Sequence, residues 1–264
     1  MQPTPFQQIV KHLTDDRTPR VWSLLVTVFG ELAQDAGSRI SGAVLRALSA
    51  QIGIKPEAMR VALHRLRKDG WIDSERTGRT SVYFLTPWGR AQSVAASPQI
   101  YAVDAPAAHA WLVMCNPAQP LEAEDISGVW LSSHVLLTPE VPLAPEVYSS
   151  ALSPDTRLPV WMTDKVCDDA TVAMAAALAK TLETLKDHLD PTPDLDGLEI
   201  AALRVLVVHS WRRIVLKTPS LPDYVFPDDW RGALCRESVC ALLTRYPKPQ
   251  LDALEAAITA PLTS

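Results

Sequence analysis

Apolar residues in the first part of the chain recur at steps of three and four. Between Arg20 and Ala33 this spacing places them on one face of an amphipathic helix. Ser41 is suited to cap a second helix, which we expect to end near Gly53. The two stretches predict a pair of packed helices early in the chain.

A third helix is predicted from Pro56 to Asp69, after a short turn. Proline is well tolerated at the first helical position, and Gly70 follows the last one. One narrow stripe of this helix is apolar, and its other faces are rich in basic residues. The candidates for DNA contact on and beside this helix are Lys55, Arg60, His64, Arg65 and Lys68, with Arg60 as the candidate for reading a base.

After Gly70 the hydrophobic period changes to two, which is typical of β-strands. Residues 71–76 and 80–85 are predicted to form a hairpin, with Arg79 at its tip. A helix-turn-helix followed by a hairpin is the winged helix-turn-helix arrangement. We therefore predict an α+β protein with a DNA-binding winged helix over residues 1–90, in which Arg79 contacts the DNA backbone or minor groove.

The remainder of the chain is richer in proline and predicts further domains. Residues 91–108 have the composition of a linker. A small α+β middle domain is expected over residues 109–190, with strands at 110–115, 128–138 and 158–163 and helices at 120–126 and 171–188. An all-helical domain is expected over residues 191–264, with helices at 198–216, 229–246 and 249–259, and with Trp230 anchoring the proline-rich connection between the first two.

Charge is distributed unevenly along the chain. The net charge is −5, but residues 1–92 contain 13 Lys and Arg against 8 Asp and Glu. A basic head on an acidic body is expected of a phosphate-binding module joined to a sensing or dimerising part. The N-terminus lacks the pattern of a secretion signal, and no apolar stretch is long enough to cross a membrane, so we expect a cytoplasmic protein without membrane contact.

The sequence contains none of the common catalytic or metal-binding motifs. The four cysteines are not paired at zinc-finger intervals, and we expect reduced, buried thiols. The histidines do not have metalloprotease spacing, and there is no nucleophile elbow, phosphate-binding loop or dinucleotide fingerprint. We therefore predict no catalytic residues, no metal and no cofactor, and interpret His209 as a core residue.

Three segments together resemble a known family. LLVTVFGE (24–31) and EAMRVALHRLRKDGWI (57–72) resemble the N-terminal domain of PaaX-type repressors of phenylacetate degradation, and WRRIVLKTPSLPDYVFPDDWRG (211–232) resembles their C-terminal signature. The resemblance implies a ferredoxin-like middle domain. It also implies a homodimeric repressor of an aromatic-acid catabolic operon, released from double-stranded DNA by an aryl-acyl-CoA, usually phenylacetyl-CoA.

For such an effector, the candidate binding residues are Trp211, Arg212 and Arg213. Two cations beside an indole can bind phosphates and stack on adenine. Alternatively, the two arginines pair with Asp228 and Asp229 and tie the proline-rich segment to its helix.

Three other functions remain open at this point. The winged helix can serve as a protein–protein module. The chain can be a CoA-ester-binding enzyme with an accessory winged helix. A nuclease-like middle domain would require acidic metal ligands, for which Asp164, Asp168 and Asp169 are candidates.

Overall fold

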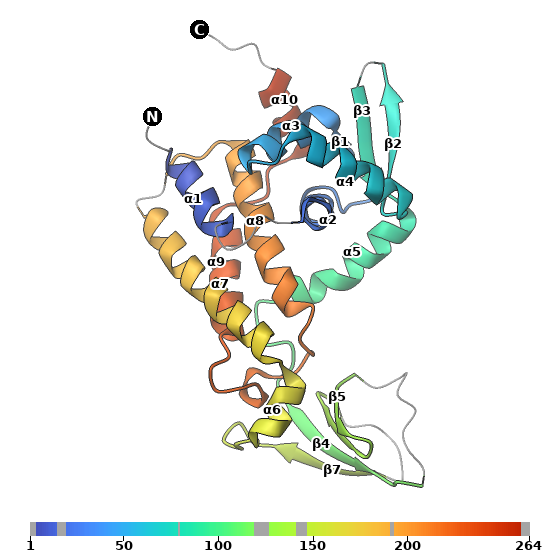
Figure 1. The fold of residues 1–264 in the computed structure, drawn as a ribbon, viewed down its shortest axis with the longest axis vertical. Helices are drawn as coiled ribbons and strands as arrows, with labels where there is room; N and C mark the ends of the chain where they lie inside the picture. Colours follow the sequence, from blue (N-terminus) through green and yellow to red (C-terminus); the bar gives the residue numbers. More distant parts are fainter. Residues whose placement is uncertain are drawn as a thin grey trace. The chain divides into compact units, whose positions relative to one another are not determined.

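The computed structural model describes residues 4–14, 20–78, 80–118, 127–140, 147–190 and 193–259 (Figure 1). The helices are α1 (Pro5–Thr14), α2 (Val21–Leu32), α3 (Gly42–Gln51), α4 (Pro56–Lys68), α5 (Pro87–Ile100), α6 (Val160–Val166), α7 (Asp169–His188), α8 (Gly197–Val215), the 3-10 helix η2 (Asp223–Val225), α9 (Gly232–Arg245) and α10 (Leu251–Thr259). The strands are β1 (Ile40–Ser41), β2 (Ile72–Thr77), β3 (Thr80–Leu85), β4 (Ala110–Cys115), β5 (Val129–Ser132), β6 (Val135–Thr138) and β7 (Val147–Leu152). The protein is therefore of the α+β class, as predicted.

The chain divides into two compact units, each assembled from separate stretches of sequence. Unit 1 comprises Met1–Pro98, Thr181–Ser210 and Val239–Ser264, and unit 2 comprises Gln99–Lys180 and Trp211–Ser238. The domains predicted in sequential order do not coincide with these units, because residues 191–264 are divided between both. Sequence reasoning placed the boundaries in proline-rich segments, whereas the units change within the helices α5, α7, α8 and α9.

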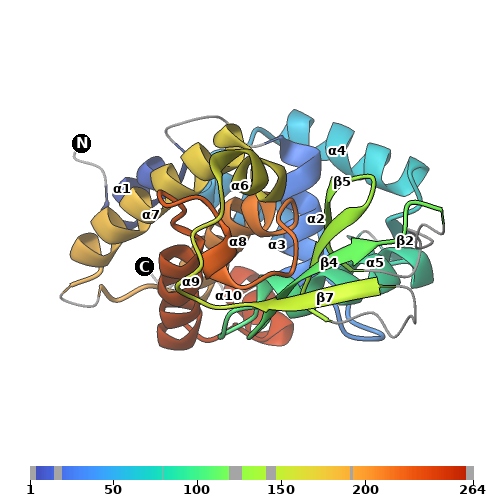
Figure 2. The ribbon, with the colours of Figure 1, turned by 90° about the horizontal axis from the view of Figure 1, so that it is seen from below.

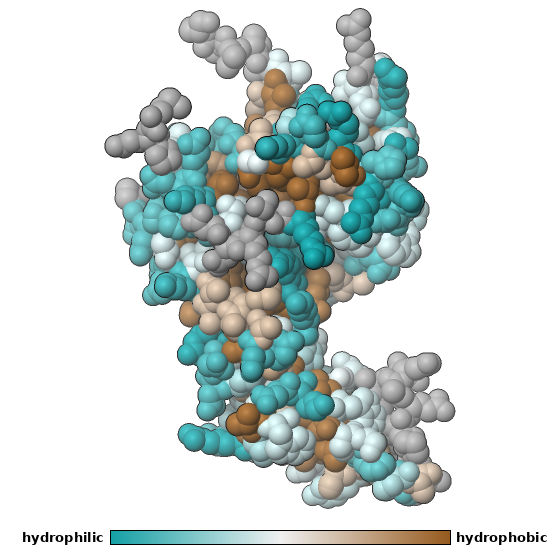
Figure 3. Space-filling view, viewed as in Figure 1, coloured by the Kyte–Doolittle hydropathy of each residue, from teal (hydrophilic) through white to brown (hydrophobic). Residues whose placement is uncertain are grey.

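Unit 1 contains the three helices predicted at the start of the chain. Helix α2 packs against α4, and α3 contacts α4, β1 and β3. The amide of Val44 donates to the Ser41 hydroxyl at 3.1 Å, which confirms Ser41 as the cap of α3. Pro56 occupies the first turn of α4, also as predicted. The hydrophilic side chains in the part of Figure 3 where α4 lies surround a small hydrophobic patch.

The predicted hairpin is present and belongs to a three-stranded antiparallel sheet. The strand order is β1-β3-β2, with Ile72 opposite Leu85 and Thr77 opposite Thr80. Strand β1 was not predicted because two residues are too few to show a period of two.

Residues 91–100 are helical, so the predicted linker is wrong over this stretch. Thr86 caps α5 by accepting a hydrogen bond from the amide of Gly89 at 3.0 Å. The small residues that suggested a linker allow close packing on α2. A side chain on Gly30 would come within 2.9 Å of the Ser93 hydroxyl, and Gln34 donates to Ser93 and Ser97, both at 2.8 Å.

C-terminal helices complete unit 1 around α2, which Figure 1 shows end-on. Arg204 of α8 donates to Glu31 of α2 at 2.7 Å, and the two side chains are 9% and 2% exposed. The same guanidinium donates to the carbonyls of Leu243 and Tyr246 near the end of α9. From α10, Glu255 accepts a hydrogen bond from the amide of Ser41 at 3.2 Å. The helix-turn-helix near the N-terminus is thus held by residues from the C-terminal part of the sequence.

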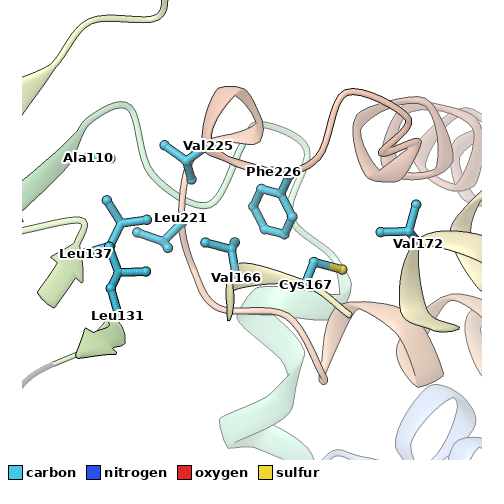
Figure 4. Close-up of a cluster of buried hydrophobic side chains, with 9 residues drawn as sticks. All are labelled: Ala110, Leu131, Leu137, Val166, Cys167, Val172, Leu221, Val225 and Phe226. Carbon is cyan, nitrogen blue, oxygen red and sulfur yellow. The ribbon is translucent and has the colours of Figure 1, made fainter. Parts of the chain in front are cut away.

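Unit 2 is built on a four-stranded antiparallel sheet in the order β5-β6-β4-β7 (Figure 2). One face of this sheet packs on the segment around α6, the start of α7 and the proline-rich chain after α8. The buried residues of this core are Ala110, Leu131, Leu137, Val166, Cys167, Val172, Leu221, Val225 and Phe226 (Figure 4). The proline-rich segment therefore supplies part of the core of unit 2.

An ion pair and an aromatic stack fix the proline-rich segment. Arg236 donates through both terminal nitrogens to Asp223, at 3.0 and 3.1 Å. Trp230 donates to the same carboxylate at 3.1 Å and stacks on Phe226 with ring centroids 4.8 Å apart. Trp230 is thus an anchor of this segment, as predicted. Its hydrogen-bond partner, Asp223, was not predicted from the sequence.

Two predictions for the middle of the chain need correction, and one strand was missed. The strand expected at 158–163 is helix α6, and a short apolar run does not distinguish the two states. The strand expected at 128–138 is the pair β5 and β6. Strand β7 was not predicted, because its alternation of small, polar and apolar residues is weak. The helix expected at 120–126 lies outside the described residues.

In the stretches that the structure describes, no helix combines the length and the hydrophobicity needed to cross a membrane.

Candidate nucleic-acid interface

Helix α4 presents two chemically different sides. Met59, Ala62, Leu63 and Leu66 are buried, as the predicted inner stripe requires. The helix has 13 residues, which corresponds to a length of about 20 Å. Gly70 then adopts a φ of +74°, a conformation that glycine tolerates and that ends the helix.

Basic side chains cover the outer side of α4. All the DNA-contact candidates on and beside the helix are exposed: Lys55, Arg60, His64, Arg65 and Lys68. The side chains of Arg60 and Arg65 are 76% and 68% exposed. Arg67, which was not among the candidates, is exposed as well. The structure therefore brings the predicted cations together on one helix and leaves them accessible to a ligand.

Two of these arginines differ in how firmly they are held. Arg60 has a loose contact with Glu57, 3.9 Å between charged atoms. Arg65 lies 3.5 Å from the Asp69 carboxylate, and its guanidinium is 5.5 Å from the centre of the Trp22 ring. A cation over an indole face is attracted by the ring quadrupole, so Arg65 is oriented before any ligand binds. The Arg60 side chain is less constrained and can change its conformation when a ligand binds.

Three tryptophans from separate elements form a row of ring contacts that begins at Trp22, under Arg65 of α4. Trp22 contacts Trp71 edge-on at a centroid distance of 6.1 Å, and Trp71 contacts Trp88 edge-on at 5.1 Å. Gly89 permits this arrangement, because a side chain there would collide with the carbonyl oxygen of Trp71. Edge-to-face contacts stabilise aromatic pairs, so the three tryptophan rings connect the starts of α2, β2 and α5.

The hairpin beside α4 carries an ion pair on its surface. Arg39, directly before β1, donates to Glu75 of β2 at 2.7 Å, and its guanidinium lies 4.5 Å from the centre of the Phe84 ring. Sequence reasoning missed Arg39 and Trp22, because no local pattern predicts partners 36 and 43 positions away. Arg79, the predicted DNA contact at the hairpin tip, lies outside the described residues.

The predicted effector residues do not form an exposed group. Trp211 is 1% exposed, and its indole N–H donates to the carbonyl of Ile100 at 3.0 Å. The ring is thus a core residue, with no face available for stacking on a ligand. Arg212 is half-buried, and burial lowers its pKa, whereas Arg213 is exposed. In this region Asp223 pairs with Arg236, and the alternative pairing of Arg212 and Arg213 with Asp228 and Asp229 stays a prediction.

The other titratable candidates have structural partners. His209 is 3% exposed and shares a 3.1 Å hydrogen bond with the Thr27 hydroxyl, as expected of a core histidine. Asp168 accepts a hydrogen bond from the amide of Thr171 at 2.7 Å, and its hydrogen bonds to Thr171 hold its pKa below the usual value. It therefore caps the first turn of α7. Within the described ranges, no three His, Cys, Asp or Glu side chains are grouped so that they could hold a metal ion.

The cysteines are free, and three of the four are buried: Cys115, Cys167 and Cys235. Burial raises the pKa of Cys167 to about 11 and that of Cys235 to about 12. Because the thiolate is the reactive form, these two thiols are unreactive at neutral pH.

Comparisons with known proteins agree with this arrangement of the chain. The family described as PaaX-like protein matches residues 20–89, and the PaaX-like protein C-terminal domain matches residues 169–252. The transcriptional repressor PaaX of Escherichia coli (strain K12) is 27% identical over 249 residues, which cover 81% of this chain and 77% of that protein. The uncharacterized protein Rv0674 from Mycobacterium tuberculosis is 18% identical, and its structure covers 89% of this chain and 97% of its own with a TM-score of 0.42. The two family regions occur in order along the chain and together match more than half of it, so this protein belongs to the PaaX-like family.

Proposed function

We propose that this protein is a transcriptional regulator that binds double-stranded DNA through α4. The observation that carries the proposal is the exposed basic side of α4, next to a hairpin and supported by a buried apolar stripe. A helix of this kind fits the major groove of B-DNA, where basic side chains meet phosphates and base edges. Family membership supports the same function and favours a regulator over an enzyme.

In this proposal residues 21–85 form a winged helix-turn-helix in which the cations have different roles. Arg60 is loosely held and exposed, which suits bidentate hydrogen bonds to guanine. Arg65 is oriented by Trp22 and Asp69, which suits a phosphate contact that fixes the position of the helix. Lys55, His64 and Lys68 add phosphate contacts, and Arg79 is assigned to the backbone or minor groove.

We further propose repression of a phenylacetate catabolic operon by a cytoplasmic homodimer. The name of the Escherichia coli relative supports repression. A dimer is expected because one recognition helix contacts few bases, and two-fold symmetry doubles the contacts on a palindrome. The order β5-β6-β4-β7, with the first strand next to the last, supports a ferredoxin-like middle domain, and this domain is our candidate for the dimerising part.

An aryl-acyl-CoA, such as phenylacetyl-CoA, is the proposed effector that releases DNA. Of the three predicted contacts, exposed Arg213 is best placed to bind a phosphate, with Arg212 beside it. Stacking on Trp211 would require the ring to leave the core, so we do not assign it this role. Calorimetry with phenylacetyl-CoA, combined with a gel-shift titration, tests the effector. No heat and an unchanged shift at millimolar ligand would contradict it.

DNA recognition is tested by sequencing the genomic fragments that co-purify with the protein and measuring affinity for the enriched sequence. We expect Arg60→Ala to weaken specific binding by about 1–3 kcal/mol while leaving binding to unrelated DNA nearly unchanged. The matched control is Arg157→Ala, which removes an exposed arginine of unit 2. Recovery of random fragments, or equal effects of both substitutions, would contradict the proposal.

A further inference from the structure

Helix α4 carries one large apolar side chain on its basic side. Val61 is 70% exposed. At about 100° per residue, it points roughly opposite to buried Met59 and Leu63 and shares its side of the helix with His64 and Lys68. It therefore lies near the middle of the surface that would enter the groove.

The fold buries little of this branched apolar side chain. Valine has a lower helix propensity than alanine, lysine or arginine, because its side chain loses rotamer freedom against the preceding turn. Burial normally compensates for this loss, but most of the Val61 side chain is exposed to solvent. A ligand with an apolar group would provide the missing contact.

The major groove offers one apolar group on the edges of the bases, the C5-methyl of thymine. We propose that Val61 contacts a thymine methyl group in the operator and so helps to determine its sequence. This inference rests on the proposed function, because it places α4 in the major groove.

The position of Val61 also restricts which base it reads. Adjacent Cα atoms are about 3.8 Å apart, close to the spacing of about 3.4 Å between base pairs. Val61 follows Arg60, the proposed guanine reader. The two side chains leave the helix about 100° apart, so we expect the recognised thymine within a few base pairs of the guanine that Arg60 contacts.

The test replaces each thymine of the enriched operator, one at a time, by deoxyuridine, which lacks only the methyl group. Wild-type protein should lose about fourfold in affinity at one thymine, the effect of withdrawing one carbon from an apolar contact at ~0.8 kcal/mol. Val61→Ala should weaken binding to the natural operator by a similar factor or more, and deoxyuridine at that thymine should then have no further effect. Val61→Thr retains a methyl group and should keep part of the response.

Val94→Ala is the matched control, since Val94 is a 51% exposed valine on α5. It should respond to deoxyuridine as wild type does. If Val61→Ala also keeps the full response at every thymine while operator binding persists, this inference is wrong and the proposed function stands. If no sequence is enriched at all, the proposed function fails, and this inference fails with it.

Discussion

The arginines of α4 and two arginines of the C-terminal helices, Arg204 and Arg236, look alike in sequence and differ completely in environment. Arg60 and Arg65 are more than two-thirds exposed, whereas Arg204 and Arg236 have 9% of their side chains exposed and are bound to carboxylates. The buried pair Arg204–Glu31 joins α8 to α2, and Arg236–Asp223 joins α9 to the proline-rich segment. The exposed group is available for a ligand, and the buried group holds the fold together.

Whether an arginine is exposed or buried depends on how much of its helix surface is packed against other elements. On α4 the buried residues form a narrow stripe, so a charged side chain on another face reaches water. Residues 201–209 of α8 are buried on all sides, which includes Arg204. A charge in such a helix must be paired, because an unpaired ion in the core costs several kcal/mol. Substitutions should therefore separate the two groups by stability and by DNA affinity.

The largest effect is expected from Arg204→Met. It leaves the Glu31 carboxylate unpaired in the core and should lower the free energy of unfolding by about 3–5 kcal/mol, measured by urea denaturation. The double variant Glu31→Leu with Arg204→Met removes both charges and should recover much of the loss. A decrease below about 1 kcal/mol in the single variant would mean that the pair is not a structural link.

A smaller loss is expected at the second buried arginine. Arg236→Met removes two hydrogen bonds to a charged acceptor and should lower the free energy of unfolding by about 2 kcal/mol. Asp223→Asn keeps an acceptor for Trp230 and should cost less. Thermal unfolding followed by circular dichroism compares the two variants. Equal losses would show that the charge of Asp223 matters more than the acceptor geometry that asparagine keeps.

The exposed group should affect DNA affinity instead of stability. Lys68→Ala should weaken binding about equally for all sequences and reduce the slope of log affinity against log salt by about 1, because one phosphate contact is lost. Fluorescence anisotropy at several salt concentrations measures the slope, with Arg157→Ala as the control. An unchanged slope would remove Lys68 from the interface.

The smallest effect on stability is expected at Arg213, the exposed member of the WRR segment. Arg213→Ala should change the free energy of unfolding by less than about 0.5 kcal/mol. If Arg213 binds an effector phosphate, the same variant should lose affinity for phenylacetyl-CoA in calorimetry. If Arg213→Ala unfolds at the same denaturant concentration as the wild type and binds phenylacetyl-CoA with the same affinity, Arg213 does not contact the effector.

Features that depend on interactions between residues close in sequence were predicted well, and features that depend on contacts between distant residues were not. Helices α2, α3 and α4, the hairpin and the Ser41 cap depend on local patterns, and they were predicted close to their observed bounds. The strand predicted at 158–163 is helical, because a short apolar run fits either state and its surroundings decide. The division of the chain depends on partners about 170 positions apart, such as Arg204 and Glu31, which no window of sequence reveals.

The candidate site shows the same limit. The exposed cations of α4 were predicted from their spacing relative to the apolar stripe, which is a local property. The WRR segment was predicted as a surface cluster, but Trp211 is in the core because the chain near Ile100 packs against it. Composition alone does not distinguish these cases, since both segments combine arginines with apolar residues.

The hydrogen bond from Ser41 to Glu255 has a consequence for how the protein is made. The cap of α3 is completed by a carboxylate that the ribosome adds more than 200 residues later. A nascent chain that has emerged only as far as α5 contains the whole of α4 but lacks Arg204 and Glu255, which hold α2 and α3. The proposed DNA-binding surface on α4 therefore gains the full support of its neighbouring helices only after synthesis has passed α10.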